Sequence, residues 1–511
     1  MKKLFFTFLL NTIFAIGFSQ TNVSGPYFSN LTWDLSGSPY TITGDVQIPK
    51  NVTLTIEPGV EVNISGNYEI LIKGSLNAVG TNLLPIKFKG STGVRTMVMF
   101  KGADLSLSKL SYLQFEGPKN AIQLGDESES SQDVIKNSGV LTVSNVSLKN
   151  TKIQTKGYWT NASLVLENVT ASETTIKGVY PRSEPIEIKN SNFNYCIIDS
   201  DAYNAGITIR NSEIISSDLI IGCCGGNFNI VSSLLKSSKI IEGEGSPVMG
   251  PLKISDTRLE NTPINLPAAT VEIKHSFVSY QSSNAIILGN GSVQCSEIIG
   301  NGSGAALTIT GKKGYDLGGS ININKSHIAQ NTIGVKISDV SSIKIENSNF
   351  DNNSLYHIEN RSNKDINASN NFWDTTDPLV ILSKNYDYYD NINYGVINTS
   401  DFLTSPNLDQ DCIELVTSVF GKNNKQTLSS VEARVFPNPA SNFVNLIFDN
   451  LNNSKDLTIE IVNTMGKQYF ISQINGSTNI QNIDVSEYPK GVYFCNIQNG
   501  HNRITKKIIV Q

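Results

Sequence analysis

The sequence repeats one short phrase, in which apolar and polar residues alternate, about every 22 residues between positions 145 and 373. Four consecutive copies, with the sequences LTVSN, LVLEN, IEIKN and ITIRN, lie at 141–145, 164–168, 186–190 and 207–211. A repeat of this length is typical of solenoids, in which each coil packs only against its neighbours. Because the phrase alternates with a period of two, the repeating unit is a strand, and the fold class is predicted to be all-β.

The last residue of each phrase, called the anchor, marks the point where we expect the chain to turn. The anchors are Asn145, Asn168, Asn190, Asn211, Ser232, Asp256, His275, Cys295, Lys325 and Asn347. Residues two and four positions before the anchors are apolar apart from Gly291, which places them on one face of a strand. Parallel stacking of the coils, about 4.8 Å apart, would join these columns into one continuous core.

A corner of one residue requires a left-handed backbone, which Asn tolerates better than other residues that carry a Cβ. We therefore expect Asn190 and Asn211 to be buried at such corners, with Asn side chains hydrogen-bonded from coil to coil. The pattern resembles the asparagine ladder of right-handed parallel β-helix proteins over about 230 residues, and right-handed is the usual sense of parallel crossovers. A leucine-rich repeat is the main alternative, but its Leu-x-x-Leu-x-Leu signature is missing.

The segments on either side of the repeats resemble the end coils of the same solenoid. Residues 52–60, 70–76 and 84–90 alternate in the same way, and the sequence NNFWD at 370–374 resembles a closing coil. A solenoid needs caps because its last coil exposes an unpaired edge. The β-helix, with its capping coils, is therefore predicted to span residues 25–406.

The last 77 residues no longer follow the repeat and contain short apolar segments of strand length, which predict a small Ig-like β-sandwich. The PNPA start at 437–440, the NTMGK turn at 463–467 and the KKIIV end at 506–510 resemble the type A sorting domain of the type IX secretion system. An unrelated Ig-like binding module is the alternative. The resemblance implies a linker at 407–432, a sorting domain at 433–511, and the type IX machinery as a partner.

The N-terminus predicts export. Residues 1–19 have two lysines, a mostly apolar stretch and small residues at Gly17 and Ser19, as in a cleaved signal peptide. The apolar stretch is too short to span a bilayer, and no transmembrane segment is expected. Together with the resemblance to the sorting domain, this implies a mature protein that is extracellular or attached to the outer-membrane surface after removal of the signal peptide and the C-terminal domain. The net charge of −5 without a basic block makes nucleic acid an unfavoured partner.

The cysteines and histidines give little evidence of a metal site or cofactor, and none is predicted. Export permits disulfides, but the spacing of the six cysteines suggests no framework, and isolated buried thiols are the favoured interpretation. The four histidines, His275, His327, His357 and His501, are scattered without the spacing of metal ligands, and each is interpreted as a solvated turn or strand residue. The acidic segment 125–133 is interpreted as a solvated insertion, with weak calcium binding as the alternative.

Candidate functional residues gather on the outward face of the first four coils. Glu167, Lys189 and Arg210 occupy one column on successive coils, and Glu187 lies beside them. The aromatic residues of the turn that leads into this face are Tyr158, Trp159, Tyr180 and Tyr203. Aromatic rings beside charged groups would suit a sugar chain. The alternative is that the charged residues only form salt bridges between coils, a common and weak interaction on protein surfaces.

The sequence favours a surface β-helix that binds glycan or builds structure, and does not favour an enzyme. The alternative is a polysaccharide lyase or a glycoside hydrolase on the same face. A lyase would need Lys189 or Arg210 as the base, and a hydrolase would need two carboxyl groups such as Glu167 and Glu187. The outward columns contain no Asp, which weighs against catalysis.

Overall fold

The computed structural model separates the chain into two compact units, Met1–Gly421 and Lys422–Gln511. It describes residues 20–64, 66–90, 96–125, 137–156, 161–179, 186–200, 206–222, 226–243, 251–281, 284–313, 316–317, 319–407, 412, 432–436, 440, 443–449, 457–463, 467–474, 480–499 and 502–510. The predicted signal peptide and the acidic segment 126–133 lie outside these residues. Within them, no helix is long and apolar enough to cross a membrane.

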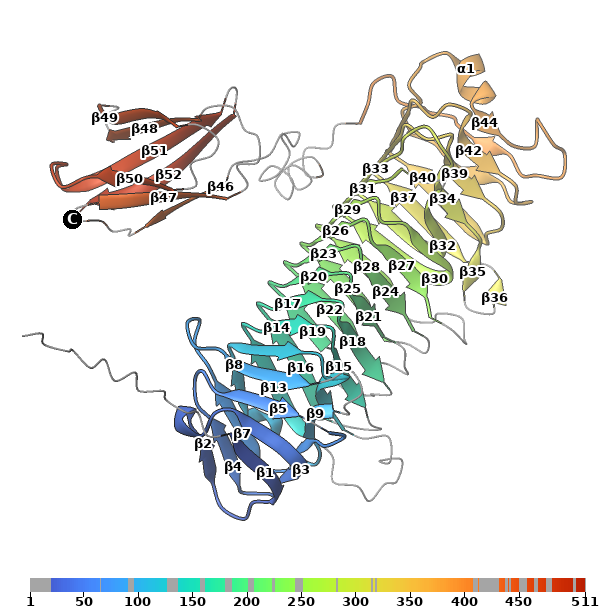
Figure 1. Cartoon of the computed structure of the whole chain (residues 1–511). Coiled ribbons are helices and arrows are strands. Elements are labelled where there is room, and N and C mark those ends of the chain that lie inside the picture. The colour runs from blue at the N-terminus through green and yellow to red at the C-terminus, as the bar shows by residue number, and fades with distance from the viewer. Residues whose placement is uncertain are drawn as a thin grey trace, which may run out of the picture. The chain divides into compact units, whose positions relative to one another are not determined.

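The first unit is the parallel β-helix that the sequence predicted (Figure 1). Each full coil contributes one strand to each of three parallel stacks, which we call the first, second and third stacks in the order that the chain visits them. The phrase of the sequence repeat forms the strands of the first stack. The column three residues after the anchors lies in the second stack.

The strands of the first stack are β2 (Leu31–Trp33), β4 (Thr53–Ile56), β7 (Ser75–Val79), β10 (Lys109–Ser111), β13 (Ser138–Ser144), β16 (Asn161–Glu167), β19 (Ile186–Lys189), β22 (Ile207–Arg210), β25 (Phe228–Val231), β28 (Leu252–Ser255), the later parts of β30 (Ile264–Lys274) and β32 (Asn284–Gln294), β37 (Ser320–Asn324), β40 (Ser342–Glu346), β43 (Ile366–Asn367) and β45 (Ile397–Asn398).

The second stack contains the first parts of β1 (Thr21–Pro26) and β3 (Tyr40–Ile48), then β5 (Glu61–Ile64), β8 (Ile86–Gly90), β11 (Leu113–Glu116), β14 (Ser147–Lys149), β17 (Thr170–Ser172), β20 (Asn192–Asn194), β23 (Glu213–Ile215), β26 (Leu234–Lys236), β29 (Arg258–Glu260), β31 (Phe277–Ser279), β33 (Glu297–Ile299), β38 (His327–Ala329) and β41 (Asn349–Asp351).

The third stack contains the later parts of β1 and β3, the first parts of β30 and β32, and β6 (Ile70–Ile72), β9 (Thr96–Phe100), β12 (Asn120–Leu124), β15 (Lys152–Lys156), β18 (Thr175–Val179), β21 (Ile197–Asp199), β24 (Asp218–Ile221), β27 (Lys239–Glu242), β34 (Ala305–Ile309), β39 (Ile333–Ile337), β42 (Tyr356–Asn360) and β44 (Asn385–Tyr386). The short elements between strands are η1 (Leu35–Gly37), η2 (Leu105–Leu107), α1 (Pro378–Ser383) and the hairpin β35 (Lys312–Lys313) and β36 (Asp316–Leu317).

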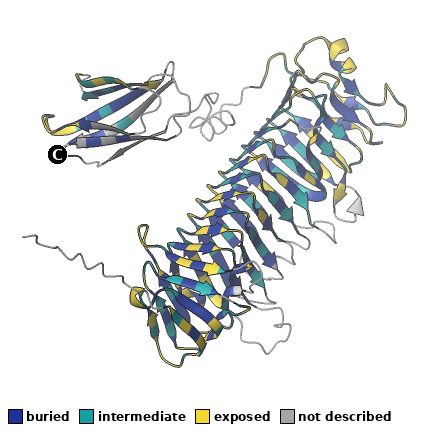
Figure 2. Cartoon of the chain, in the orientation of Figure 1, coloured by how far each residue is buried: buried dark blue, intermediate teal, exposed yellow. Residues whose placement is uncertain are grey.

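The apolar columns of the sequence fill a continuous core along the solenoid (Figure 2). Ile188 and Ile209, each two residues before an anchor, are fully buried, as are the second-stack residues Phe193 and Ile214. Burial of one such side chain contributes about 1.5–3 kcal/mol. Register therefore depends on this alternation, because a slip by one residue would turn every apolar side chain toward solvent.

The anchors adopt the left-handed backbone that was predicted, with φ between 46° and 55° at all ten positions. The predicted burial was wrong, however, because the side chains of Asn190 and Asn211 are exposed. A residue in this conformation turns its side chain outward, and the next residue enters the core instead. Ser191 and Ser212 occupy that inner position and are 1% and 4% exposed.

A ladder of hydroxyl groups therefore replaces the predicted asparagine ladder over most coils. From Val169 to Ser348, the backbone N–H of the residue that follows the anchor donates to the side-chain oxygen of its counterpart on the next coil, at 2.9–3.3 Å, and the last acceptor is Asn371. These residues are Val169, Ser191, Ser212, Ser233, Thr257, Ser276, Ser296, Ser326, Ser348 and Asn371. Each hydroxyl also donates to the carbonyl two residues earlier, at 2.7–3.0 Å. Among the anchors, Asn168 donates to Asn145 at 3.3 Å.

A second left-handed corner follows five residues after many of the anchors, between the second and third stacks. Asn150, Glu173, Tyr195 and Ser216 have positive φ there. The residue after this corner again points inward: the N–H of Cys196 donates to Ser217 Oγ at 2.9 Å, and that of Ser217 donates to Ser238 Oγ at 3.1 Å. Both corners are thus built from an exposed left-handed residue followed by a buried polar one.

The C-terminal end of the solenoid is closed by a cap and held by a disulfide. Trp373 is fully buried and stacks on Phe350, with ring centroids 5.0 Å apart. The chain then returns along the first corner, where Asn407 hydrogen-bonds Asn349 in both directions at 2.7 and 2.9 Å. Beyond it, Cys412 forms a disulfide with Cys295.

This disulfide corrects the interpretation of all cysteines as isolated thiols. The two residues are separated by 117 positions, so the sequence alone offered no reason to pair them. Cys196 and Cys495 are buried free thiols, as expected. Cys223 and Cys224 lie outside the described residues.

The second unit is a small β-sandwich, as predicted. One antiparallel sheet contains β46 (Glu432–Phe436), β47 (Phe443–Asp449) and β50 (Ile480–Asp484), and the other contains β48 (Leu457–Asn463), β49 (Gln468–Ile474), β51 (Gly491–Asn499) and β52 (Asn502–Val510). Val444 and Ile461, from different sheets, belong to one buried cluster. Tyr493 Oη donates to the carbonyl of Pro489 at 2.6 Å, which ties the start of β51 to the preceding loop.

Candidate functional site

The four charged residues singled out from the sequence lie together on the outward face of the first stack. Glu167, Lys189 and Arg210 are direct partners in the register of β16, β19 and β22. Glu187 precedes Lys189 by two residues on β19 and is the register partner of Val165. The parallel pairing therefore brings together residues that are about 20 positions apart in the chain.

These residues form two ion pairs between neighbouring strands. Lys189 Nζ lies 3.5 Å from Glu167 Oε2, and Arg210 Nε lies 3.7 Å from Glu187 Oε1. All four side chains are about a third to a half exposed, so each pair contributes no more than about 1 kcal/mol to stability. Each carboxylate is thus matched by a cation, and neither stands as an isolated acid or base.

The four aromatic residues singled out with them, Tyr158, Trp159, Tyr180 and Tyr203, lie outside the described residues. Their positions in the chain fall in the connections that follow β15, β18 and β21 and precede β16, β19 and β22. These connections join the third stack to the first. The described residues nearest to them in sequence are therefore the ends of the third-stack strands.

The outward face of the third stack carries a polar column that the sequence reasoning missed. Gln154 Nε2 donates to Gln123 Oε1 at 2.6 Å, and Lys177 Nζ lies 2.9 Å from Asp199 Oδ2. Gln154 and Lys177 are register partners, so the four side chains follow one another along the axis. Three of these residues stand nine positions after an anchor, and this spacing is the signal that would have revealed the column.

A group of lysines surrounds this polar column. Burial, together with the charges of Lys177, Lys119 and Lys156, lowers the pKa of Lys152, while Asp199 opposes that shift. Lys152 and Lys156 are both on β15 and are partly buried. Lys152 begins β15 at the second corner, whereas Lys156 ends it next to the connection to the first stack, so the lysines are spread across the third stack.

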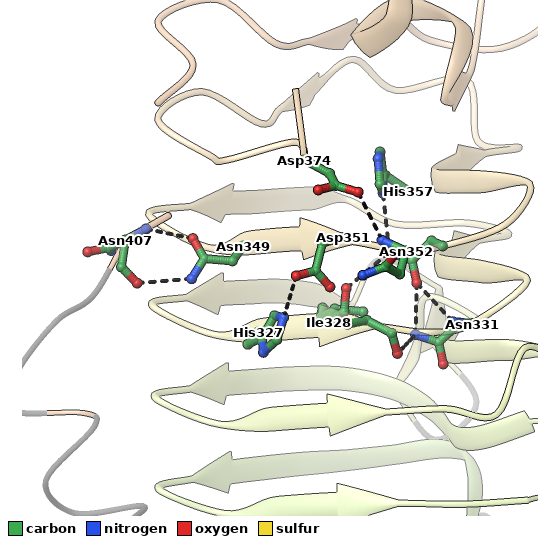
Figure 3. Close-up of polar contacts among 11 residues, drawn as sticks. His327, Ile328, Asn331, Asn349, Asp351, Asn352, His357, Asp374 and Asn407 are labelled. Carbon is green, nitrogen blue, oxygen red and sulfur yellow. Dashed lines mark hydrogen bonds and ion pairs between the residues drawn. The ribbon is translucent and has the colours of Figure 1, made fainter. Parts of the chain in front are cut away.

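A His–Asp pair lies on the outward face of the second stack, near the C-terminal end (Figure 3). His327 Nε2 is 3.2 Å from Asp351 Oδ2. Burial opposes protonation, but the hydrogen bond and charge of Asp351, with the charge of Glu297, raise the pKa of His327. The hydrogen bond from His327 lowers the pKa of Asp351. Among the described residues, no group of three or more His, Cys, Asp or Glu side chains is arranged to hold a metal ion.

The neighbouring His357 belongs to the interior (Figure 3). Burial, with the charge of Lys384, lowers its pKa to about 4, so this imidazole is neutral at ordinary pH. It is 3.2 Å from Asn353 Nδ2, and Asn353 in turn accepts from the backbone and side chain of Asn331. This network closes the last coils, and the sequence expectation of a solvated histidine was wrong for His357.

The C-terminal cap carries exposed aromatic residues that the sequence reasoning did not select. Tyr356 and Tyr386 pack with ring centroids 5.3 Å apart, and Tyr394 lies 6.0 Å from Tyr386. Tyr388 and Tyr389 project from the following loop. This loop has no repeat period, so only a count of aromatic residues between 386 and 394 could have drawn attention to it.

Comparison with known protein families identifies the second unit. Residues 434–511 match the family model described as the secretion system C-terminal sorting domain. No curated protein matches the chain. The chain therefore interacts with the type IX secretion machinery, which exports it to the cell surface or the extracellular space.

Proposed function

We propose that the β-helix of this exported protein is a non-catalytic glycan-binding surface, with the polymer lying along the edge between the third and first stacks from β12 to β22. The coils repeat about every 4.8 Å along the axis, so a linear polymer meets a repeated set of donors and acceptors. Lys177, whose side chain is 26% exposed, supplies such a group on the third stack, next to the buried pair Gln123 and Gln154. In the sequence, the four selected aromatic residues follow the third-stack strands β15, β18 and β21 and precede the first-stack strands β16, β19 and β22.

The observation that carries the proposal is the pairing of both candidate carboxylates with cations. Hydrolysis of a glycosidic bond needs one protonated acid and one free carboxylate in the same site. Glu167 and Glu187 instead face Lys189 and Arg210 at 3.5 and 3.7 Å. The same ion pairs hold Lys189 and Arg210 in their charged form, whereas a lyase would need one of these two residues as an uncharged base. Binding without turnover is the function that this arrangement supports best.

A panel of soluble polysaccharides, neutral and acidic, tests the proposal. The lysines around Lys152 make acidic polymers a necessary part of the panel. Affinity electrophoresis of the secreted protein should identify a retarding polymer, and Tyr180→Ala with Tyr203→Ala should weaken that retardation about tenfold, as for an aromatic hot spot. Tyr195→Ala is the matched control, because this exposed tyrosine lies on the same coils at the second corner.

The length of the bound polymer distinguishes the proposal from the enzyme alternative. A binding protein leaves the polymer length unchanged after prolonged incubation, whereas a lyase produces unsaturated oligosaccharides and a hydrolase produces saturated ones. Product formation that is abolished by Arg210→Ala or Glu167→Ala, with binding retained, would replace the proposal by the enzymatic function.

A further inference from the structure

The loop between β44 and β45 is held in one conformation by a buried aspartate. Asp387 is 4% exposed, and its two carboxylate oxygens accept the N–H groups of Tyr389 at 2.9 Å and Ile397 at 2.7 Å. Its carbonyl accepts the N–H groups of Asp390 and Asn391 at 3.0 and 2.9 Å. A carboxylate that accepts backbone N–H groups at both ends of a loop fixes the path of the loop between them.

This fixed loop presents large side chains to solvent. Tyr389 and Ile392 are 75% and 79% exposed, and Tyr388 is 44% exposed. The two tyrosine rings meet edge to face, with centroids 5.7 Å apart and planes at 81°. Rings that are exposed and already ordered lose little conformational entropy when they contact a ligand, which is the usual property of a recognition surface.

The neighbouring end of the third stack adds a polar group that is incompletely paired. Arg361 Nε donates to Glu359 Oε1 at 2.6 Å, and Arg361 is half exposed. The side chain of Glu359 is 3% exposed, and its Oε2 accepts no hydrogen bond in the described structure; Lys336 Nζ lies 3.8 Å away. This oxygen is closed to solvent, so Glu359 serves to hold Arg361, and the half-exposed guanidinium of Arg361 is the group that a ligand hydroxyl can reach.

We propose that Tyr356, Tyr386, Tyr388, Tyr389 and Tyr394 form a second glycan-binding surface, the cap surface, which takes pyranose rings by stacking and uses Arg361, held by Glu359, as its polar contact. A sugar ring offers an apolar C–H face for the tyrosine rings and a hydroxyl edge for charged donors and acceptors. The cap surface is separate from the edge at β12–β22, so a result that refutes the function proposed for that edge does not refute the cap surface.

The charge around the cap surface favours a neutral sugar. The carboxylate of Asp390 is close enough to raise the pKa of Tyr356, after the larger effect of burial. Glu359 is buried on the same side and already holds Arg361. An acidic polymer would therefore meet Asp390 and a neutralised arginine, whereas a neutral pyranose needs only stacking and hydroxyl contacts. The cap surface thus differs in preference from the lysine-rich edge of the third stack.

Isothermal titration and affinity electrophoresis of the secreted protein with a soluble β-glucan, a xylan, a mannan and alginate test the inference. The double variant Tyr388→Ala/Tyr389→Ala should weaken binding of at least one neutral polymer about tenfold. The variant Tyr388→Ala/Tyr389→Trp, which keeps one large ring, should recover part of the lost affinity. Phe28→Ala removes an 81% exposed ring from the N-terminal coils and should leave binding unchanged. Circular dichroism checks that each variant is folded.

The variants that lose binding show which of the two surfaces, the cap surface or the edge at β12–β22, holds the polymer. Loss with Tyr388→Ala/Tyr389→Ala but not with Tyr180→Ala/Tyr203→Ala supports the cap surface and contradicts the edge at β12–β22. The reverse pattern overturns the cap surface and leaves the first proposal standing. A parent protein that binds alginate alone, or none of the four polymers, also overturns the cap surface.

Discussion

At the residue scale, the residue that follows an anchor contributes more hydrogen bonds to the corner than the anchor itself does. Ser212 accepts the N–H of Ser191 at 3.1 Å, donates its hydroxyl to the carbonyl of Arg210 at 2.7 Å, and donates its own N–H to Ser233 at 3.2 Å. The corner opens the backbone and leaves these groups without strand partners. One buried hydroxyl per coil satisfies them, and the anchor only has to adopt the left-handed conformation.

The first prediction compares the two positions. Ser212→Ala should lower the free energy of unfolding by about 1–3 kcal/mol, because the buried N–H of Ser191 loses its acceptor. Asn211→Gly should change it by no more than a few tenths of a kcal/mol, because Gly adopts positive φ without strain. Asn190→Val should cost about 1–3 kcal/mol through backbone strain alone. Chemical denaturation measures all three, and a larger loss for Asn211→Gly than for Ser212→Ala would refute the assignment.

The second prediction concerns the His327–Asp351 pair. The folded pKa of His327 is above the ordinary value of 6.5, so its contribution is complete below that value and disappears as the pH rises through the folded pKa. The folded pKa of Asp351 is below 3.8, so its contribution is present above that value and disappears as the pH falls through the folded pKa. The pair is therefore most stabilising between about pH 4 and 6.5.

Melting temperatures across pH 4–9 test this reasoning. His327→Gln should lose most stability relative to the parent inside that window, and the two proteins should converge above it. His275→Gln is the control, because burial, with the charge of Lys274, lowers the pKa of His275, which gives a contribution of opposite sign. A difference between His327→Gln and the parent that grows toward pH 9 would show that the ion pair is not the cause.

At the element scale, the repeat predicts strands well where their residues keep a fixed distance from the anchor. The first and second stacks have this property, so the column Glu167, Lys189 and Arg210 follows directly from the sequence. The connections that follow the third stack vary in length, and for this reason the third-stack strands were not recognised in the sequence. Gln154 nevertheless stands at a fixed distance from its anchor, nine positions after Asn145. The His327–Asp351 pair spans neighbouring coils at different positions, and it becomes visible only once the register is known.

The loop of the cap could not be predicted for a different reason. Its conformation depends on Asp387, whose partners Tyr389 and Ile397 have no counterpart on other coils. Position in a repeat carries no information about a contact that occurs once. The inward turn of Ser191 recurs on most coils and was missed for another reason: the direction of a side chain at a left-handed corner follows from backbone geometry and not from hydrophobicity.

The third prediction tests the disulfide between Cys295 and Cys412. Replacing both cysteines by serine should destabilise the cap by about 2–4 kcal/mol, because the bond closes a long loop in the unfolded chain. Non-reducing peptide mapping should recover the two cysteines in one linked peptide. The double variant should melt earlier than the oxidised parent, and recovery of both cysteines as free thiols from secreted protein would contradict the pairing.

At the scale of the whole molecule, the chain consists of a β-helix and a sorting domain with separate cores. The last described contacts of the β-helix are those of Asn407 and Cys412, and the match to the sorting domain begins at residue 434. Cleavage before Cys412 would leave the C-terminal fragment attached through the disulfide. We therefore expect removal of the sorting domain, which the resemblance to type A sorting domains implies, to occur after Cys412.

The fourth prediction follows from this order. The mature protein should retain Cys412 and lack residues 421–511, so its C-terminus should lie within 412–420. Intact mass of the secreted protein, measured with and without reduction, locates this end. A secreted chain that keeps Gln511, or one that ends before Cys412, would refute the prediction.

The return of the chain to Cys295 also has a mechanical consequence. Asn407 contacts the coil of Asn347 and Asn349, and Cys412 reaches back to β32, so the exit point of the chain lies on the side of the solenoid and not at its tip. When the C-terminal end is held, the disulfide carries the tension directly to Cys295, next to the end of β32. The coils between Cys295 and Cys412, the cap included, then lie outside the loaded path of the backbone, so a pull on this end does not unwind them one after another.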